Sequence, residues 1–151
     1  MGKACHSILL ECYEGGNITM TDEERRALVS LRLQNAKDTL IELPVLIEHG
    51  FWNTTVSRMY YACYYAVAAL LLKHGICVKT HSGIRQAFSK EFVLTGQIDK
   101  EQSKFYSNLY ANRQSGDYDD FIMMNEDKVR ELYPKAVVFI DIIERLINED
   151  L

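Results

Sequence analysis

The chain has 151 residues, of which 48% are apolar and 25% are charged, with only two prolines and eight glycines. This composition is typical of one compact helical domain and argues against a β-sandwich or a disordered chain. The formal net charge of −4 gives no overall attraction for nucleic acid. Any nucleic-acid contact would therefore use a local patch, and we expect no DNA partner.

The cysteines and the apolar runs indicate a cytoplasmic protein. Four cysteines form no CxxC pair, which is typical of free thiols in a reducing compartment. The most apolar run, residues 59–72, is too short to span a bilayer, and no signal peptide is recognisable. The sequence also lacks a glycine-rich phosphate loop and a Glu-x-x-His pair, so we expect neither a cofactor nor a metal site.

Helical periodicity begins after an N-terminal extension, residues 1–20, which we expect to be flexible; residues 21–151 are expected to form a single domain. Thr21 and Glu24 form a capping box that predicts the start of the first helix, and Gly50 predicts its end. Pro44 is expected to kink its last turn. One side of this helix carries Leu28, Ala36, Leu40, Leu43 and Ile47.

The next two helices differ in length. The second is expected to begin with a cap at Asn53 or Thr54 and to end at Gly75, after a basic last turn. The third is short: it opens at Thr80 or Ser82 and ends near residue 96. Its apolar residues Ile84, Phe88 and Phe92 fall in line, and His81 falls on the same face.

Two more helices complete the domain. The fourth is expected from a cap at Asp99 to about Gln114. The fifth follows a cap at Asn125 and has Pro134 in an early turn. Its long stripe consists of Leu132, Ala136, Phe139, Ile143 and Leu146. The pattern predicts an all-α protein, an antiparallel up-and-down bundle of four or five helices.

The fourth helix carries an arginine where its pattern would bury an apolar side chain. Arg113 projects into the arc formed by Phe105, Tyr106, Leu109 and Tyr110. A guanidinium in that position needs an anion or a polar cleft. Asp117 could hold it as a structural i,i+4 ion pair, or the arginine and the acidic turn after it could form a site. The pattern leaves both open.

The second helix is apolar nearly all round, which raises the question of what covers it. Tyrosines occupy one broad sector, and aliphatic residues occupy much of the remainder. A small bundle would hide only part of this surface, so we expect a homodimer whose interface includes Tyr60, Tyr61, Tyr64 and Tyr65. The alternative is a central core helix whose tyrosine hydroxyls reach the rim.

Several motifs in register resemble one known family. The segment Ser57-Arg-Met-Tyr-Tyr-Ala-Cys-Tyr-Tyr-Ala66, then Lys79-Thr-His-Ser-Gly83, then Arg113-(x3)-Asp117-Tyr118, is similar to the HEPN superfamily (higher eukaryotes and prokaryotes nucleotide-binding). The resemblance runs from residue 22 to residue 148 and points to the small stand-alone prokaryotic members. It implies a dimerising helical bundle. Many such relatives are encoded beside a minimal nucleotidyltransferase, forming a toxin–antitoxin pair in which the HEPN member is an RNase or is silenced by its partner.

The resemblance also identifies a departure at the site. Ribonuclease members carry an arginine followed four to six residues later by a histidine; here Arg113 is followed by Tyr118, and no histidine occurs after His81. RNA cleavage through the 2′-hydroxyl needs a proton carrier and a cation for the phosphate. Histidine, with a pKa of about 6.5, suits the first role better than tyrosine. Arg113, Tyr118 and His81 are thus the catalytic candidates.

Other residues are candidates for ligand binding: Arg58, Lys79, Thr80, Ser82 and Asp117. A helix start with a cation and hydroxyls is a plausible anion site. The structural alternatives are a Thr80 cap with His81 as a hydrogen-bonded packing residue, and Arg58 stacked on Tyr61 and Tyr65.

Two classes of function follow. In the first, the protein is the toxin of a nucleotidyltransferase pair and acts on RNA as a dimer, and if active it is a metal-independent endoribonuclease. In the second, it is a non-catalytic subunit that binds a nucleotide or docks a nucleotidyltransferase. RNA cleavage that is lost on Arg113→Ala would separate the two classes.

Overall fold

The computed structural model describes the backbone of residues 20–118 and 124–149. It describes the side chains of residues 20–112 and 124–149. This part of the chain contains five α-helices and one π-helical turn, and no strand. The helices are α2 (Asp22–Glu48), α3 (Trp52–Lys73), α4 (His81–Phe88), α5 (Lys100–Tyr118) and α6 (Glu126–Glu149), with η1 (Ser89–Val93) continuing α4. The predicted all-α class is therefore confirmed.

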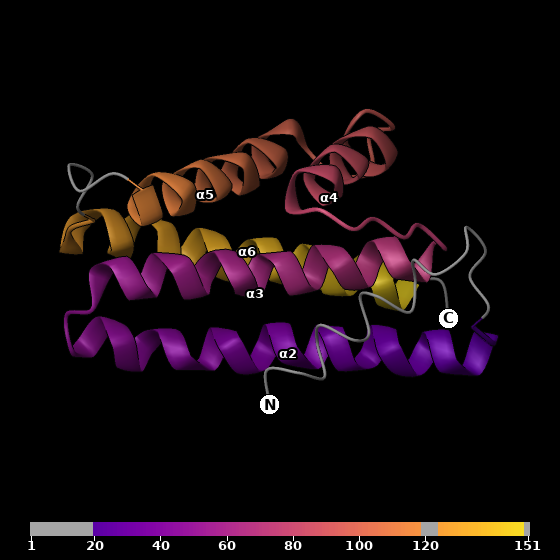
Figure 1. Ribbon diagram of the computed structural model, residues 1–151, viewed down its shortest axis with the longest axis horizontal. Coiled ribbons are helices and arrows are strands. Elements are labelled where there is room, and N and C mark those ends of the chain that lie inside the picture. The colour runs from indigo at the N-terminus through magenta and orange to yellow at the C-terminus, as the bar shows by residue number, and fades with distance from the viewer. Residues whose placement is uncertain (1–19, 119–123, 150–151) are drawn as a thin grey trace.

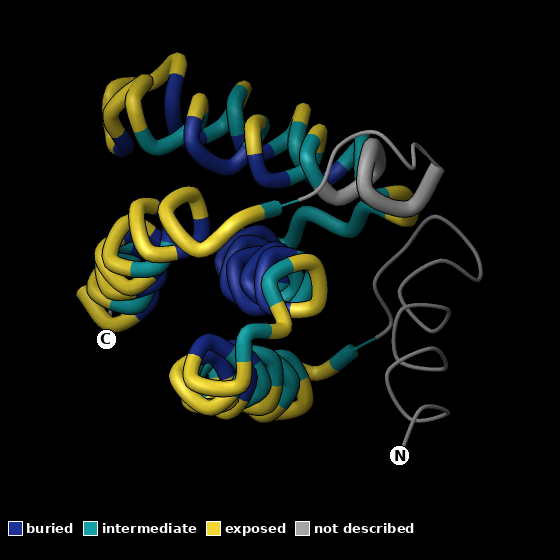
Figure 2. Tube along the Cα trace, turned by 90° about the vertical axis from the view of Figure 1, so that its left-hand side faces the viewer, coloured by how far each residue is buried: buried dark blue, intermediate teal, exposed yellow. Residues whose placement is uncertain are grey.

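Helix α3 lies at the centre of the fold. Helices α2 and α3 run side by side in opposite directions, α6 lies behind α3, and α4 and α5 cover its remaining side (Figure 1). Viewed along the helices, the buried residues concentrate in α3, and the helices around it bury only their inward faces (Figure 2). Of the 22 residues of α3, 14 are buried in the single chain.

Local capping explains where most helices begin. The Thr21 hydroxyl accepts the Glu24 backbone N–H at 3.1 Å, and the Glu24 carboxylate accepts the Thr21 N–H, so the predicted capping box is confirmed. The caps at Thr80 and Asn125 are also confirmed, since each side-chain oxygen accepts the N–H three residues further on. Gly50 adopts a φ of 73° between α2 and α3, which side chains other than glycine disfavour.

The predicted cap of α3 was wrong. This helix begins one residue before Asn53, and its N-cap residue Phe51 makes no side-chain capping bond. The Asn53 amide oxygen instead accepts the Met124 N–H at 3.0 Å, and so it ties the start of α3 to the segment that precedes α6. Helix α5 also differs, because it continues one turn beyond Gln114 to Tyr118.

Candidate functional site

His81 opens α4 and turns its ring inward onto the tyrosines of α3. Its Nδ1 shares a hydrogen bond of 2.8 Å with the Tyr60 hydroxyl, and its ring stacks on Tyr64 with 4.4 Å between centroids. The Thr80 cap fixes the first turn of α4. The sequence prediction that His81 shares a face with Phe88 is confirmed, and the contact to Tyr60 defines the orientation of the imidazole.

Gly83 allows the chain to close tightly before this helix. A Cβ at this position would lie 2.5 Å from Val78 Cγ1 and 2.7 Å from the Thr80 Oγ1, closer than non-bonded atoms tolerate. Any larger residue would therefore push the 78–80 segment away from α4 and disturb the cap beside His81. The glycine holds the histidine in place indirectly, through backbone geometry.

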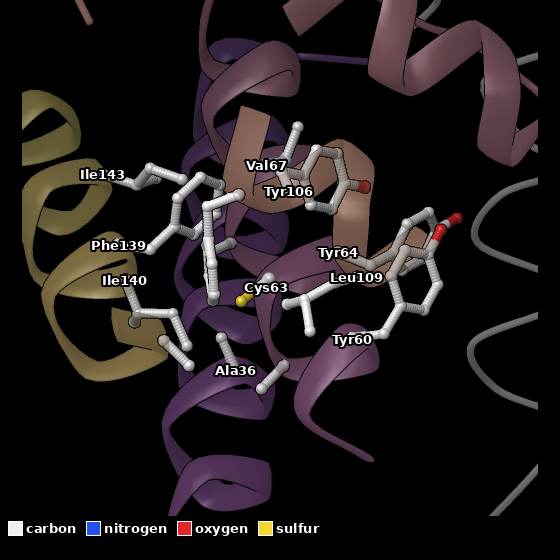
Figure 3. Close-up of a cluster of buried hydrophobic side chains, with 14 of the residues drawn as sticks. Ala36, Tyr60, Cys63, Tyr64, Val67, Tyr106, Leu109, Phe139, Ile140 and Ile143 are labelled. Atoms are coloured by element: carbon white, nitrogen blue, oxygen red, sulfur yellow. The ribbon is translucent and has the colours of Figure 1, made fainter. Parts of the chain in front are cut away.

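The tyrosines of α3 and α5 continue the cluster beneath His81. Tyr60 stacks on Tyr106 with 5.9 Å between ring centroids and a 7° interplanar angle, and it lies 6.0 Å from Tyr110. Figure 3 shows the hydroxyls of Tyr60, Tyr64 and Tyr106 pointing to the same side, away from Ile140 and Ile143. Aromatic rings thus make up most of the candidate site, with their hydroxyls on one side.

The Tyr106 hydroxyl differs from the other hydroxyls of this cluster in its hydrogen bonding. The side chain is only 1% exposed, and within the described residues no partner meets hydrogen-bond geometry at its oxygen. Burial raises the pKa of Tyr106 well above its ordinary value, and the neighbouring Tyr60 raises it further. Burial and the neighbouring Tyr60 thus keep Tyr106 neutral, although no described residue reaches its hydroxyl in good hydrogen-bond geometry.

Arg85 lies one helical turn after His81 on the same side of α4. Its guanidinium carbon is 4.8 Å from the centroid of the Tyr110 ring, and its Nε is buried with no hydrogen-bond partner among the described residues. Sequence reasoning missed this arginine. The available signal was its i,i+4 spacing from His81, which places both on one helix face.

The predicted ligand-binding residues do not all come together. The structure brings His81 to Tyr60, Tyr61 and Tyr64, but Arg58 instead pairs with Glu42 of α2, at 3.0 Å and 3.2 Å. The Ser82 hydroxyl lies 3.5 Å from that of Thr80, and both Lys79 and Thr80 are exposed. Phosphate contact by Arg58, Lys79, Thr80 and Ser82 stays a prediction.

The sequence motif in α5 lies at the edge of the described region. The arc that precedes Arg113 is as predicted, because Phe105, Tyr106 and Leu109 are buried. The backbone of α5 includes Arg113, Asp117 and Tyr118, but their side chains lie outside the described residues, so their roles stay predictions.

The burial of the tyrosines changes the argument for a dimer. Tyr60 is 0% and Tyr64 is 5% exposed within one chain, whereas Tyr61 and Tyr65 are partly exposed. The single chain covers most of α3, because α2, α4, α5 and α6 surround it. Of the four predicted interface tyrosines, only Tyr61 and Tyr65 retain surface in the single chain, and the dimer stays a prediction.

The described residues also bear on metal binding and on membrane insertion. In residues 20–112 and 124–149, no three side chains of His, Cys, Asp or Glu gather in a way that could hold a metal ion. No helix of the described chain combines the length and the apolarity needed to cross a bilayer. The expectation of no cofactor is untested by these observations.

Comparison with known proteins identifies the family. Residues 29–146 match the HEPN domain family, which covers most of the chain, and the protein belongs to this family. A UPF0332 protein of Thermotoga maritima is 38% identical over 126 residues, covering 83% of this chain and 96% of the relative. A Methanocaldococcus jannaschii protein named "Putative toxin MJ0142" is 34% identical over 109 residues, covering 72% of this chain and 74% of the relative. A second M. jannaschii protein, "Putative toxin MJ0605", is 29% identical and covers 85% of this chain and 92% of the relative.

Proposed function

We propose that this HEPN protein is a toxin that binds RNA at the tyrosine–histidine cluster and cleaves it without a metal ion. The relatives named as toxins support the biological role. The observation that carries the chemistry is the imidazole of His81, held between the Tyr60 hydroxyl and the Tyr64 ring. Histidine is the side chain best suited to proton exchange near neutral pH.

The proposed reaction is an internal transesterification. The 2′-hydroxyl of one ribose loses its proton to a base and attacks the adjacent phosphorus, and the bond from phosphorus to the 5′-oxygen breaks. The products are a 2′,3′-cyclic phosphate and a 5′-hydroxyl that has gained a proton, so no co-reactant is consumed. His81 exchanges the protons in this scheme, and Arg113 stabilises the charge that develops on the phosphate.

The direct test uses a labelled single-stranded RNA in the presence of EDTA, with a DNA of the same sequence for comparison. The His81→Asn variant keeps a polar group near Tyr60 but cannot carry a proton, and His49→Ala removes an exposed histidine as the control. Cleavage of RNA that is lost only in His81→Asn supports the proposal. Binding without cleavage in the wild type favours the non-catalytic subunit, and absence of both overturns an RNA function.

Two partners belong to the same proposal. A homodimer would bring a second copy to the partly exposed Tyr61 and Tyr65, and light scattering at tens of micromolar tests it; a monomer there would remove the dimer. A nucleotidyltransferase antitoxin would silence the protein. Co-expression with an adjacent nucleotidyltransferase should therefore relieve growth inhibition and yield a stable complex on purification.

A further inference from the structure

Arg85 occupies a position that its contacts with the described residues do not explain. The side chain is half-buried, and its Nε is shielded from water with no acceptor among the described residues. No carboxylate of the described chain forms an ion pair with it, and its recorded contact is the Tyr110 ring. A ring face attracts the positive charge but gives an N–H group no conventional hydrogen-bond acceptor. Shielding one N–H of a charged group without a partner is costly. The side chain keeps exposed surface, through which an anion could reach the remaining N–H groups of the guanidinium.

A second observation concerns the same aromatic cluster. The Tyr106 hydroxyl is buried and unsatisfied, and Tyr106 is linked to Arg85 through the rings of Tyr60 and Tyr110. Two uncompensated polar groups thus belong to one cluster, which also holds His81. Natural proteins satisfy nearly all buried polar atoms, and exceptions concentrate where function requires them.

We propose that Arg85 is a phosphate-binding residue and that, with His81, it forms a phosphodiester site on one face of α4. The two residues are one turn apart, so a phosphate bound by the guanidinium would lie beside the imidazole. A guanidinium can donate two parallel hydrogen bonds to a phosphate, which gives it affinity and geometry that a lysine lacks. This inference rests on the proposed RNA function and names the group that holds the substrate backbone.

The proposed phosphate site uses other residues than the arginine motif in α5. Arg85 and His81 belong to one short helix of one chain, and their placement depends on the Thr80 cap and on the close approach at Gly83. Of the clustered tyrosines, Tyr61, Tyr65 and Tyr110 keep exposed surface, on which unpaired bases could stack as they do in many complexes with single-stranded RNA. The cluster therefore combines a phosphate contact, a proton carrier and stacking surfaces.

The test compares Arg85→Ala, Arg85→Lys and Arg85→Gln with Arg145→Ala, which removes an exposed guanidinium paired with Asp141 on α6. Fluorescence anisotropy with a labelled 20-nucleotide RNA, repeated from 50 to 300 mM salt, measures affinity and its salt dependence. Melting curves of every variant establish folding, and the lysine and glutamine variants preserve the packing stem if the alanine variant fails to fold.

We expect Arg85→Ala to weaken RNA binding by about ten- to a hundredfold, the range for a lost charged hydrogen bond. The slope of log affinity against log salt should fall by about 0.7, the value for one single-strand phosphate contact. Arg85→Lys should recover part of the affinity, and Arg145→Ala should change it less than about twofold. A lower melting temperature with unchanged RNA affinity and salt slope would overturn the inference, because Arg85 would then be structural.

A mononucleotide separates this inference from the proposed RNA function. Uridine monophosphate is titrated while the histidine ring signals are followed by NMR, with His81→Asn used to assign the signal of His81. If the wild type fails to bind RNA but the mononucleotide shifts the His81 signal only when Arg85 is present, the phosphate site stands and the RNA function falls. If RNA binds and substitution of Arg85 does not change its affinity, the RNA function stands and the phosphate site at Arg85 falls.

Discussion

The two sides of α3 are built on different principles. Toward α2 and α6 it packs against aliphatic residues such as Ala36, Ile140 and Ile143, which are almost completely buried (Figure 3). Toward α4 and α5 it presents tyrosines to the imidazole of His81 and to the tyrosine rings of α5, where the Arg85 guanidinium lies over Tyr110. Two of the three buried side-chain polar atoms without a partner in the described chain, on Tyr106 and Arg85, lie on this second side.

Under the proposed function, the first side carries stability and the second carries function. Close packing of aliphatic side chains stabilises the folded state whether or not a ligand is bound. Unsatisfied polar atoms reduce that free energy, and proteins tolerate this where binding or catalysis gains from it. The aliphatic side should therefore respond to mutation with lost stability, and the aromatic side with lost RNA binding or cleavage.

The largest effect is expected on the aliphatic side. Ile143→Ala leaves a cavity in a fully buried position of α6, and it should lower the free energy of unfolding by about 3 kcal/mol. RNA affinity measured well below the melting temperature should be unchanged. Urea unfolding measures the stability, and fluorescence anisotropy measures the RNA affinity. A loss of RNA affinity in the folded variant would contradict the assignment of stability and function to different sides of α3.

Arg113→Ala tests whether the arginine near the end of α5 belongs to the functional side of the molecule. If Arg113 faces the site, RNA binding should weaken by about 1.5–3 kcal/mol while stability changes by less than about 1 kcal/mol. Asp117→Ala is the companion variant, because a structural pair would make both changes destabilising. Equal losses of stability with unaltered RNA binding would show that this arginine only steadies the helix end.

Tyr60→Phe tests whether the cluster acts through the orientation of His81. Removal of the hydroxyl breaks the hydrogen bond to Nδ1 and should cost about 1 kcal/mol of stability. RNA cleavage should fall more than RNA affinity, since the phosphate contacts remain. Tyr133→Phe, a half-buried tyrosine of α6, is the matched control. Unchanged cleavage in Tyr60→Phe would contradict a positioning role for Tyr60.

Tyr106→Phe should have the smallest effect on stability and the opposite sign. It deletes a buried, unsatisfied hydroxyl, so below pH 10 the variant should be as stable as the wild type, or more stable by up to about 1 kcal/mol. Burial raises the pKa of Tyr106, so above its ordinary value of 10.0 the unfolded chain loses this proton while the folded chain keeps it. Wild-type stability therefore falls as pH rises beyond 10, and the variant should lose less.

Chemical denaturation of Tyr106→Phe and wild type at pH 8 and pH 10.5 measures this difference. The same variant should bind RNA more weakly if the hydroxyl lines the site. A destabilised variant with the wild-type pH dependence would mean that the hydroxyl is satisfied in solution.

Much of the fold was predictable because it depends on neighbours in sequence. The capping oxygens at Thr21, Thr80 and Asn125 meet N–H groups three residues away, and helical periodicity alone placed His81 on the inward face with Phe88. These features need only a local backbone geometry, which the residue types themselves favour. The family followed from motifs of the same local kind.

Tertiary structure decided the rest, because it depends on which helices meet. Asn53 looked like a cap but instead binds the segment before α6, which the sequence around it does not indicate. The all-round apolar surface of α3 suggested a partner subunit, although four other helices of the same chain cover most of it. Arg85 gained its significance only when packing placed it against Tyr110 with its Nε buried. Burial and hydrogen bonding depend on contacts between residues that are far apart in the sequence. The sequence therefore predicts which residues share a helix face, but it does not predict which other helix that face packs against.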